Sequence, residues 1–199
     1  MSKTDRSYLS KNEVSKQRTM KNMLDNVIAK INCEANRIAA YIEQGSDWNG
    51  SYIYDAPVIV DSLSLGEINK LYGRWGVYVF VMKEDFVLTR DNVIKWANVK
   101  GAPINNWHDY ELYENQCFYV GSAVKPECSL YTRTKDHFLD REKTALRLSN
   151  DSRSIMKDKL KCLAFPIKKT YPKDQYDILL RRTEKKLHEV LKPVCGIRR

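Results

Sequence analysis

Apolar residues recur every three or four positions over the first part of the chain. The residues with this spacing are Met20, Met23, Leu24, Val27, Ile28, Ile31, Ala35, Ile38, Ala39 and Ile42. They lie on one face of a helix, so the pattern predicts a long amphipathic helix over residues 11–44, ended by Gly45. Such a face packs against a core or against a second copy of the chain, and the spacing does not separate the two.

Runs of β-branched and aromatic residues predict three strands. They are Trp75–Met82, Cys117–Gly121 and Cys162–Ile167. We expect residues 83–85 to turn the first run into a hairpin with Phe86–Leu88. Pro166 predicts that the last strand lies at an edge of its sheet, because proline has no N–H to donate. A further short apolar run occupies residues 56–60.

Helical patterns separate and follow these strands. They cover residues 64–72, 92–99, 129–138, 150–160 and 174–191, and Pro193 ends the last one. Together the elements predict an α+β protein. We divide it into a helical N-terminal extension, residues 1–73, and a domain of residues 74–199 with an inserted loop at about 83–116.

The charge of the chain is concentrated at one end. The 199 residues carry a net charge of +9, and residues 121–199 hold 20 Lys and Arg against 10 Asp and Glu. This asymmetry favours a polyanion partner, most often nucleic acid. No run of eighteen apolar residues and no secretory signal pattern occurs, so we expect neither a membrane span nor secretion. Five cysteines without a C-x-x-C spacing suit reduced thiols in a cytoplasm.

Five candidate residues occur in a distinctive order. Tyr78 ends the tripeptide Gly-Val-Tyr at the start of a strand, and Tyr119 begins Tyr-Val-Gly at the end of a later one. Arg133 and His137 are four residues apart and share a helix face, and Glu184 lies on the last helix. Strand tyrosines usually serve packing, and charged helix residues are usually solvated. The ordered set is more specific than any member of it.

This order resembles the GIY-YIG nuclease superfamily over residues 75 to about 196. The resemblance implies a small three-stranded antiparallel sheet flanked by helices, and hydrolysis of phosphodiesters with one divalent cation. It implies Glu184 as the ligand of Mg²⁺, with Mn²⁺ as a substitute. Tyr78 would be the base or would position the attacking water, and Tyr119 would hydrogen-bond beside it.

The remaining implied roles concern charge and protons. Arg133 would stabilise the negative charge that develops on the phosphate, because guanidinium binds phosphate bidentately. His137 would shuttle a proton or lower the pKa of a tyrosine. Further DNA contacts are expected from Lys125, Lys135, Arg181, Lys185 and Trp107.

We therefore predict an Mg²⁺-dependent endonuclease that acts on duplex DNA in a restriction system or a mobile element, with a homodimer as a possible assembly. The sequence departs from the family pattern at two places. No Asn follows Pro193, and Ser122 stands where a Lys often follows the second motif. Two alternatives stay open: the missing Asn motivates a DNA-binding module with a decayed active site, and the charge alone motivates a basic RNA-binding protein.

Overall fold

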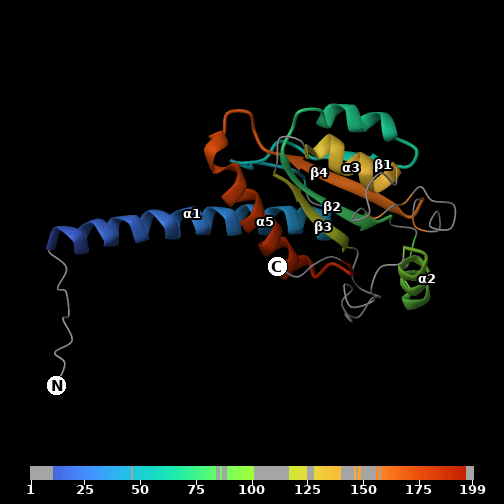
Figure 1. Cartoon of the computed structure of the whole chain (residues 1–199), viewed down its shortest axis with the longest axis horizontal. Helices are drawn as coiled ribbons and strands as arrows, with labels where there is room; N and C mark the ends of the chain where they lie inside the picture. The colour runs from blue at the N-terminus through green and yellow to red at the C-terminus, as the bar shows by residue number, and fades with distance from the viewer. Residues whose placement is uncertain are drawn as a thin grey trace, which may run out of the picture.

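A four-stranded antiparallel sheet with strand order β1-β4-β2-β3 forms the middle layer of the computed structural model (Figure 1). The structure describes residues 11–45, 47–83, 86, 89–100, 117–124, 128–139, 146, 148, 156 and 158–195. The strands are β1 (Val58–Asp61), β2 (Gly76–Met82), β3 (Cys117–Ala123) and β4 (Leu160–Pro166). The helices are α1 (Lys11–Gln44), α2 (Arg90–Lys100), α3 (Leu130–Leu139) and α5 (Tyr176–Leu191), with 3₁₀ turns η1 (Leu65–Leu71) and η3 (Lys173–Gln175). The α+β class predicted from the sequence is confirmed.

The sheet differs from the predicted three strands because the apolar run at 56–60 supplies most of β1. β1 pairs with β4, so the sheet draws a strand from the segment that was assigned to the N-terminal extension. The predicted hairpin is wrong, because β2 pairs with β3 on one side and β4 on the other. Phe86 lies outside any strand, and Glu84, Asp85, Val87 and Leu88 lie outside the described residues.

Pro166 does not mark an edge strand. β4 is an inner strand between β1 and β2, and Pro166 is its last residue, opposite Gly76. There the missing N–H matters little, while its carbonyl oxygen accepts a hydrogen bond from the Asp55 N–H at 2.8 Å. Most of the helix predicted at 150–160 lies outside the described residues, and Leu160 already belongs to β4.

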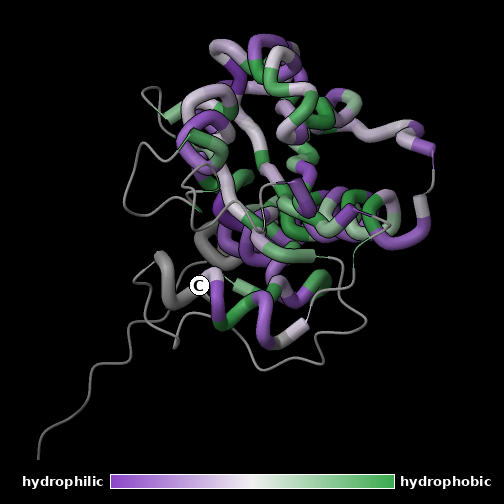
Figure 2. Tube along the Cα trace, turned by 90° about the vertical axis from the view of Figure 1, so that its right-hand side faces the viewer, coloured by the Kyte–Doolittle hydropathy of each residue, from purple (hydrophilic) through white to green (hydrophobic). Residues whose placement is uncertain are grey.

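Helices cover both faces of the sheet, which is why β2 is apolar throughout. Tyr78 and Phe80 face the layer of α3 and η1, whereas Val77 and Val79 face the layer of α1 and α5. Every residue of β2 is buried as a result. Figure 2 shows apolar and polar positions alternating along the helices that cover the sheet, as expected for elements with one buried side.

Helix α1 matches the predicted range, and Gly45 follows it with a φ of 60°. Its second half packs against α5 and the sheet through Ile31, Ala35 and Ile38. Its first half extends away from the sheet (Figure 1), and Met20 and Met23 there are 73% and 65% exposed. Nowhere in the described chain is a helix apolar enough over a sufficient length to cross a membrane.

Candidate functional site

Three aromatic rings from three elements meet on the α3 side of the sheet. Tyr78 comes from β2, Tyr119 from β3 and His137 from α3. The ring centroids are 6.1 Å apart for Tyr78 and Tyr119, 5.4 Å for Tyr78 and His137, and 5.1 Å for Tyr119 and His137. The antiparallel pairing of β2 with β3 brings the two tyrosines together although they are far apart in the sequence.

Both motif glycines stand where a side chain would collide with a neighbour. Gly121 is the register partner of Tyr78, and a Cβ on Gly121 would lie 2.5 Å from Cζ and Oη of the Tyr78 phenol. A Cβ on Gly76 would lie 2.1 Å from the Phe165 carbonyl oxygen. Gly121 therefore leaves room for the tyrosine of the other motif, and Gly76 allows β2 to approach β4 closely.

His137 is held in one tautomer by a backbone contact. It is 3% exposed, and the Leu146 N–H donates to its Nδ1 at 2.8 Å. A backbone N–H can only donate, so Nδ1 carries no proton and the proton of the neutral ring lies on Nε2. Nε2 lies 3.1 Å from the Tyr78 hydroxyl and donates to its oxygen. The Tyr78 proton is then available for the hydrogen bond with Tyr119.

Glu184 on α5 lies close enough to the tyrosines to interact with them electrostatically. It is 8% exposed, and its Oε2 accepts a hydrogen bond from the Ser122 hydroxyl on β3. Its carboxylate interacts electrostatically with the hydroxyls of Tyr78 and Tyr119, and so does the Arg133 guanidinium on α3. The site thus holds one anion and one cation beside two phenols.

The tyrosines keep their protons more firmly than free phenols. Burial raises the pKa of Tyr119 to about 12, with a further upward contribution from Glu184. Burial also raises the pKa of Tyr78 well above its ordinary value, and the neighbouring Tyr119 adds to this, while Arg133 acts in the opposite direction. Near neutral pH both phenols are therefore protonated, which disfavours action of either one as a base.

The segment after Pro193 also borders the site. Val194 and Cys195 donate backbone hydrogen bonds to Cys117 and Phe118, and Cys195 forms an isolated bridge with Tyr119. Cys195 is 4% exposed and its thiol donates to the Phe118 carbonyl oxygen at 3.1 Å. The segment after Pro193 thus places a buried thiol next to Tyr119.

The donor set suits a hard cation that keeps most of its water. Within the described ranges no three His, Cys, Asp or Glu side chains gather as a metal cage. Glu184 is a single carboxylate with one oxygen, Oε2, engaged by Ser122. Mg²⁺ is commonly held by one or two carboxylates, with water and substrate phosphate in the other positions, so Glu184 fits such an ion.

The predicted DNA-contact residues do not all join this cluster. Lys135 is partly buried on α3, where its Nζ donates to the Tyr131 hydroxyl at 2.9 Å. Arg181 and Lys185 are exposed on α5, and Arg181 pairs with Asp177 at 2.7 Å. Lys125 and Trp107 lie outside the described residues.

The structure thus places three of the predicted catalytic residues, Tyr78, Tyr119 and His137, in contact. The other two, Arg133 and Glu184, lie within electrostatic range of both phenols, and Ser122 bonds the Glu184 carboxylate. Ser122 was visible in the sequence only as a departure after the second motif, although a hydroxyl on a strand that faces a helix is a common partner of a carboxylate. In comparisons with known proteins, no family model, curated protein or solved structure matches the chain.

Proposed function

We propose that this protein is a divalent-cation-dependent DNA endonuclease of the GIY-YIG type. The observation that carries the proposal is that Tyr78, Tyr119 and His137 form one hydrogen-bonded group, while Arg133 and Glu184 lie within electrostatic range of both phenols; the five residues come from four elements. A cluster that served only packing would have no need of a buried carboxylate and a guanidinium beside the phenols.

The cluster supplies the groups that phosphodiester hydrolysis requires. Arg133 offers donors and positive charge to the phosphoryl oxygens as negative charge develops on them. The protonated phenol of Tyr119 offers a further hydrogen-bond donor to the phosphate. His137 fixes Tyr78 through the Nε2–H bond, and Tyr78 in turn orients Tyr119. Positioning and electrostatic stabilisation of this kind account for much of enzymatic rate enhancement.

Glu184 would hold the cation, with Ser122 orienting its carboxylate. When bound, a divalent cation neutralises charge on the phosphate and lowers the pKa of a coordinated water. Mg²⁺ is the expected ion and Mn²⁺ its substitute.

One such site cuts one DNA strand at a time, so cleavage of both strands of a duplex needs two sites or two successive cuts. We propose that the protein acts as a homodimer whose second copy packs on the exposed half of α1. The apolar stripe Met20, Met23, Leu24 and Val27 continues the buried stripe of Ile31, Ala35 and Ile38 along the same helix, which favours a helical partner with the same pattern. A restriction or mobile-element setting suits a protein of this kind.

A plasmid cleavage assay tests the proposed activity. Supercoiled DNA is incubated with the protein in Mg²⁺, in EDTA, and with the variants Glu184→Gln and Glu189→Gln. Glu189 is an exposed carboxylate on the same helix, paired with Lys186 at 3.0 Å, so its substitution is the matched control. We expect Mg²⁺-dependent cleavage that Glu184→Gln abolishes and Glu189→Gln retains, with DNA binding kept by both.

Two other outcomes point elsewhere. Salt-sensitive DNA binding without cleavage would favour a decayed binding module. The reason to consider this alternative is the segment after Pro193, which has no Asn and places Cys195 beside Tyr119. A preference for RNA that is unaffected by Glu184→Gln would favour a basic RNA-binding protein.

A further inference from the structure

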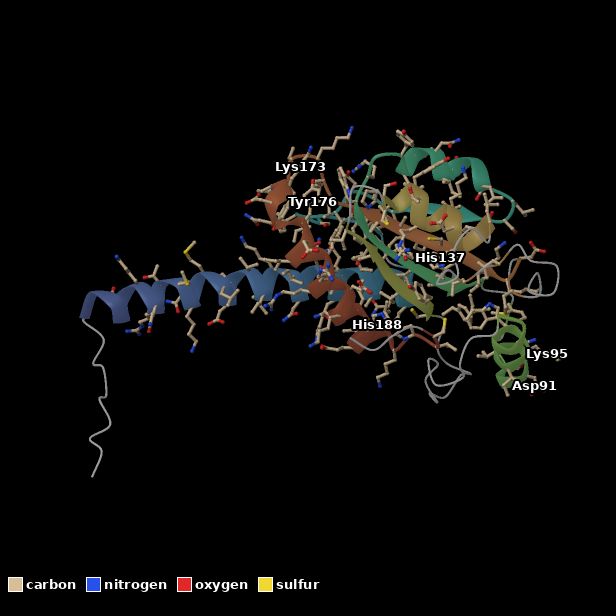
Figure 3. All side chains as sticks on the ribbon, in the orientation of Figure 1. Asp91, Lys95, His137, Lys173, Tyr176 and His188 are labelled. Carbon is tan, nitrogen blue, oxygen red and sulfur yellow. The ribbon has the colours of Figure 1, made fainter. Side chains whose placement is uncertain are left out.

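A basic and aromatic groove lies at the start of η3 and α5, away from the tyrosine cluster. It has a volume of about 270 Å³, and its lining includes Arg74, Trp75, Lys169, Lys173 and Tyr176. Figure 3 shows Lys173 and Tyr176 near each other at the beginning of α5, well apart from Lys95 on α2. The groove is not part of the site described above.

The aromatic side chains form the wall of the groove. The rings of Trp75 and Tyr176 have centroids 5.9 Å apart at an angle of 59°. Tyr176 is 8% exposed, so it is a rigid element, while Trp75 is partly exposed. The Lys173 ammonium lies 6.0 Å from the centroid of the Trp75 ring. Trp75 therefore presents an indole surface with a cation beside it.

The three cationic side chains of the groove differ in whether an acidic side chain already pairs with them. The Arg74 guanidinium bonds the Asp55 carboxylate and donates to the Ile167 carbonyl oxygen at 2.9 Å. Lys169 and Lys173 are exposed, and within the described part of the chain neither has an acidic partner. Arg74 is fixed in place, and the two lysines remain available to an anion.

This combination matches the chemistry of a nucleotide. Proteins that bind single strands combine a positive groove for the phosphates with aromatic side chains on which bases stack. Pockets for drug-sized ligands hold roughly 300–1,000 Å³, so a groove of this size holds one nucleotide and not an oligonucleotide. A base can reach the indole only when it is out of its own duplex stack.

The groove also lies at a useful distance from Glu184. Tyr176 precedes Glu184 by eight residues on α5, and at 1.5 Å per residue this corresponds to about 12 Å along the helix. One strand of DNA advances about 3.4 Å per nucleotide along the duplex axis. The separation therefore corresponds to a few nucleotides of one strand.

We propose that this groove binds one unpaired nucleotide of the substrate strand, a few nucleotides from the bond that is cut. Its phosphate contacts Lys169 and Lys173, and its base stacks on Trp75. The position relative to the cut rests on the proposed nuclease function, whereas binding of a single strand does not. The substrate class that follows is duplex DNA with a single-stranded segment next to the cleavage point, such as a branch or a frayed end.

The test measures binding in EDTA, so that it does not depend on cleavage. A short oligothymidylate of about six nucleotides is titrated into the protein, and tryptophan fluorescence is followed. We expect quenching that Trp75→Phe removes. Lys173→Glu should weaken binding about tenfold or more, because it removes a charge-assisted phosphate contact. It should also reduce the slope of log K against log salt by roughly 0.7.

Lys95→Glu is the matched control, because Lys95 is exposed on α2 and its charge change is the same. Equal effects of the two reversals, or quenching that survives Trp75→Phe, would overturn the groove as the binding site. The two proposals fail separately. If the protein cuts the plasmid but Lys173→Glu and Lys95→Glu bind the oligonucleotide equally, the nuclease proposal holds and the groove proposal fails. If the protein never cuts DNA but only Lys173→Glu loses oligonucleotide binding, the groove proposal holds and the nuclease proposal fails.

Discussion

The phenol of Tyr78 occupies the space directly over Gly121, its register partner on the neighbouring strand. The first motif therefore contributes the phenol ring, and the absence of a side chain at Gly121 in the second motif leaves the space for it. This relationship explains why a tyrosine in one motif and a glycine in the other belong to one structural unit. It also fixes the Tyr78 hydroxyl next to His137 and Tyr119.

Replacing Gly121 by alanine should displace the Tyr78 ring. The new Cβ would lie 2.5 Å from two atoms of the phenol, and β2 is buried on both faces, so the ring has little room to move. We expect a loss of about 1–3 kcal/mol of unfolding free energy and a much larger loss of cleavage. Gly66→Ala is the control, because a Cβ there meets nothing within 4 Å. Urea unfolding and plasmid cleavage measure both effects; equal behaviour of the two variants would contradict the packing argument.

Ser122→Ala should weaken cleavage without disturbing the fold. The change removes the hydroxyl that bonds Glu184 Oε2 and leaves the carboxylate without its orienting partner. Removal of a group that orients a metal ligand typically lowers metal affinity or activity roughly 10- to 100-fold. A titration of the cleavage rate with Mg²⁺ should show a higher requirement for the cation.

The conservative variant distinguishes positioning from packing at this residue. Ser122→Thr keeps the hydroxyl and should restore most of the activity, whereas a purely steric role would make threonine the worse substitution. An unchanged Mg²⁺ requirement in Ser122→Ala would show that Ser122 does not orient Glu184.

The raised pKa of Tyr119 predicts a loss of stability at high pH. Folding raises this pKa from about 10 to about 12, so the folded state holds the proton more tightly than the unfolded state. The resulting stabilisation is present below pH 10 and is lost as pH rises from about 10 to about 12, by about 1.4 kcal/mol per pH unit. Tyr119→Phe has no proton to lose and should show a flatter decline.

Urea unfolding at several pH values between about 9 and 11.5 measures this difference. Tyr52→Phe is the matched control, because Tyr52 is 83% exposed and lies outside the cluster. The argument fails if the declines of Tyr119→Phe and the unmodified protein are parallel through that range.

Local patterns in the sequence predicted most helices and the inner strands. The spacing of Ile31, Ala35 and Ile38 predicted α1, and the β-branched and aromatic run at 75–82 predicted the strand β2. The sequence did not reveal β1, because a four-residue strand is too short to show a period, and its assignment depends on pairing with β4. The prediction of an edge strand from Pro166 was wrong because a proline restricts a strand only where a backbone N–H has to donate a hydrogen bond.

The candidate site was predicted as a set of residues but not as a set of contacts. The order of the motifs along the chain indicated which residues belong to the candidate site, namely Tyr78, Tyr119, Arg133, His137 and Glu184. The tautomer of His137 depends on the Leu146 N–H, a backbone group that no side-chain pattern reveals. The upward shifts of the tyrosine pKa values depend on burial between layers, which the sequence shows only after the layers are known.

The exposed stripe of α1 predicts the assembly state. Met20, Met23, Leu24 and Val27 are 73%, 65%, 50% and 41% exposed, yet they follow the spacing of the buried stripe further along the helix. Burial of apolar surface against a partner stabilises the complex by a free energy of about 25 cal/mol for each Å² covered. We expect the protein to sediment as a dimer and Met20→Glu/Leu24→Glu to sediment as a monomer, because two carboxylates would then lie in the interface.

Asn22→Glu/Ala29→Glu is the control for this test. Both residues are exposed on the opposite face of α1, and the pair adds the same charge. This variant should remain a dimer in sedimentation velocity. Loss of the dimer in both variants would indicate a charge effect, and a monomeric unmodified protein would remove α1 as the dimer interface. If the stripe variant is monomeric, nicking should persist while double-strand cutting declines, since each copy holds one complete cluster.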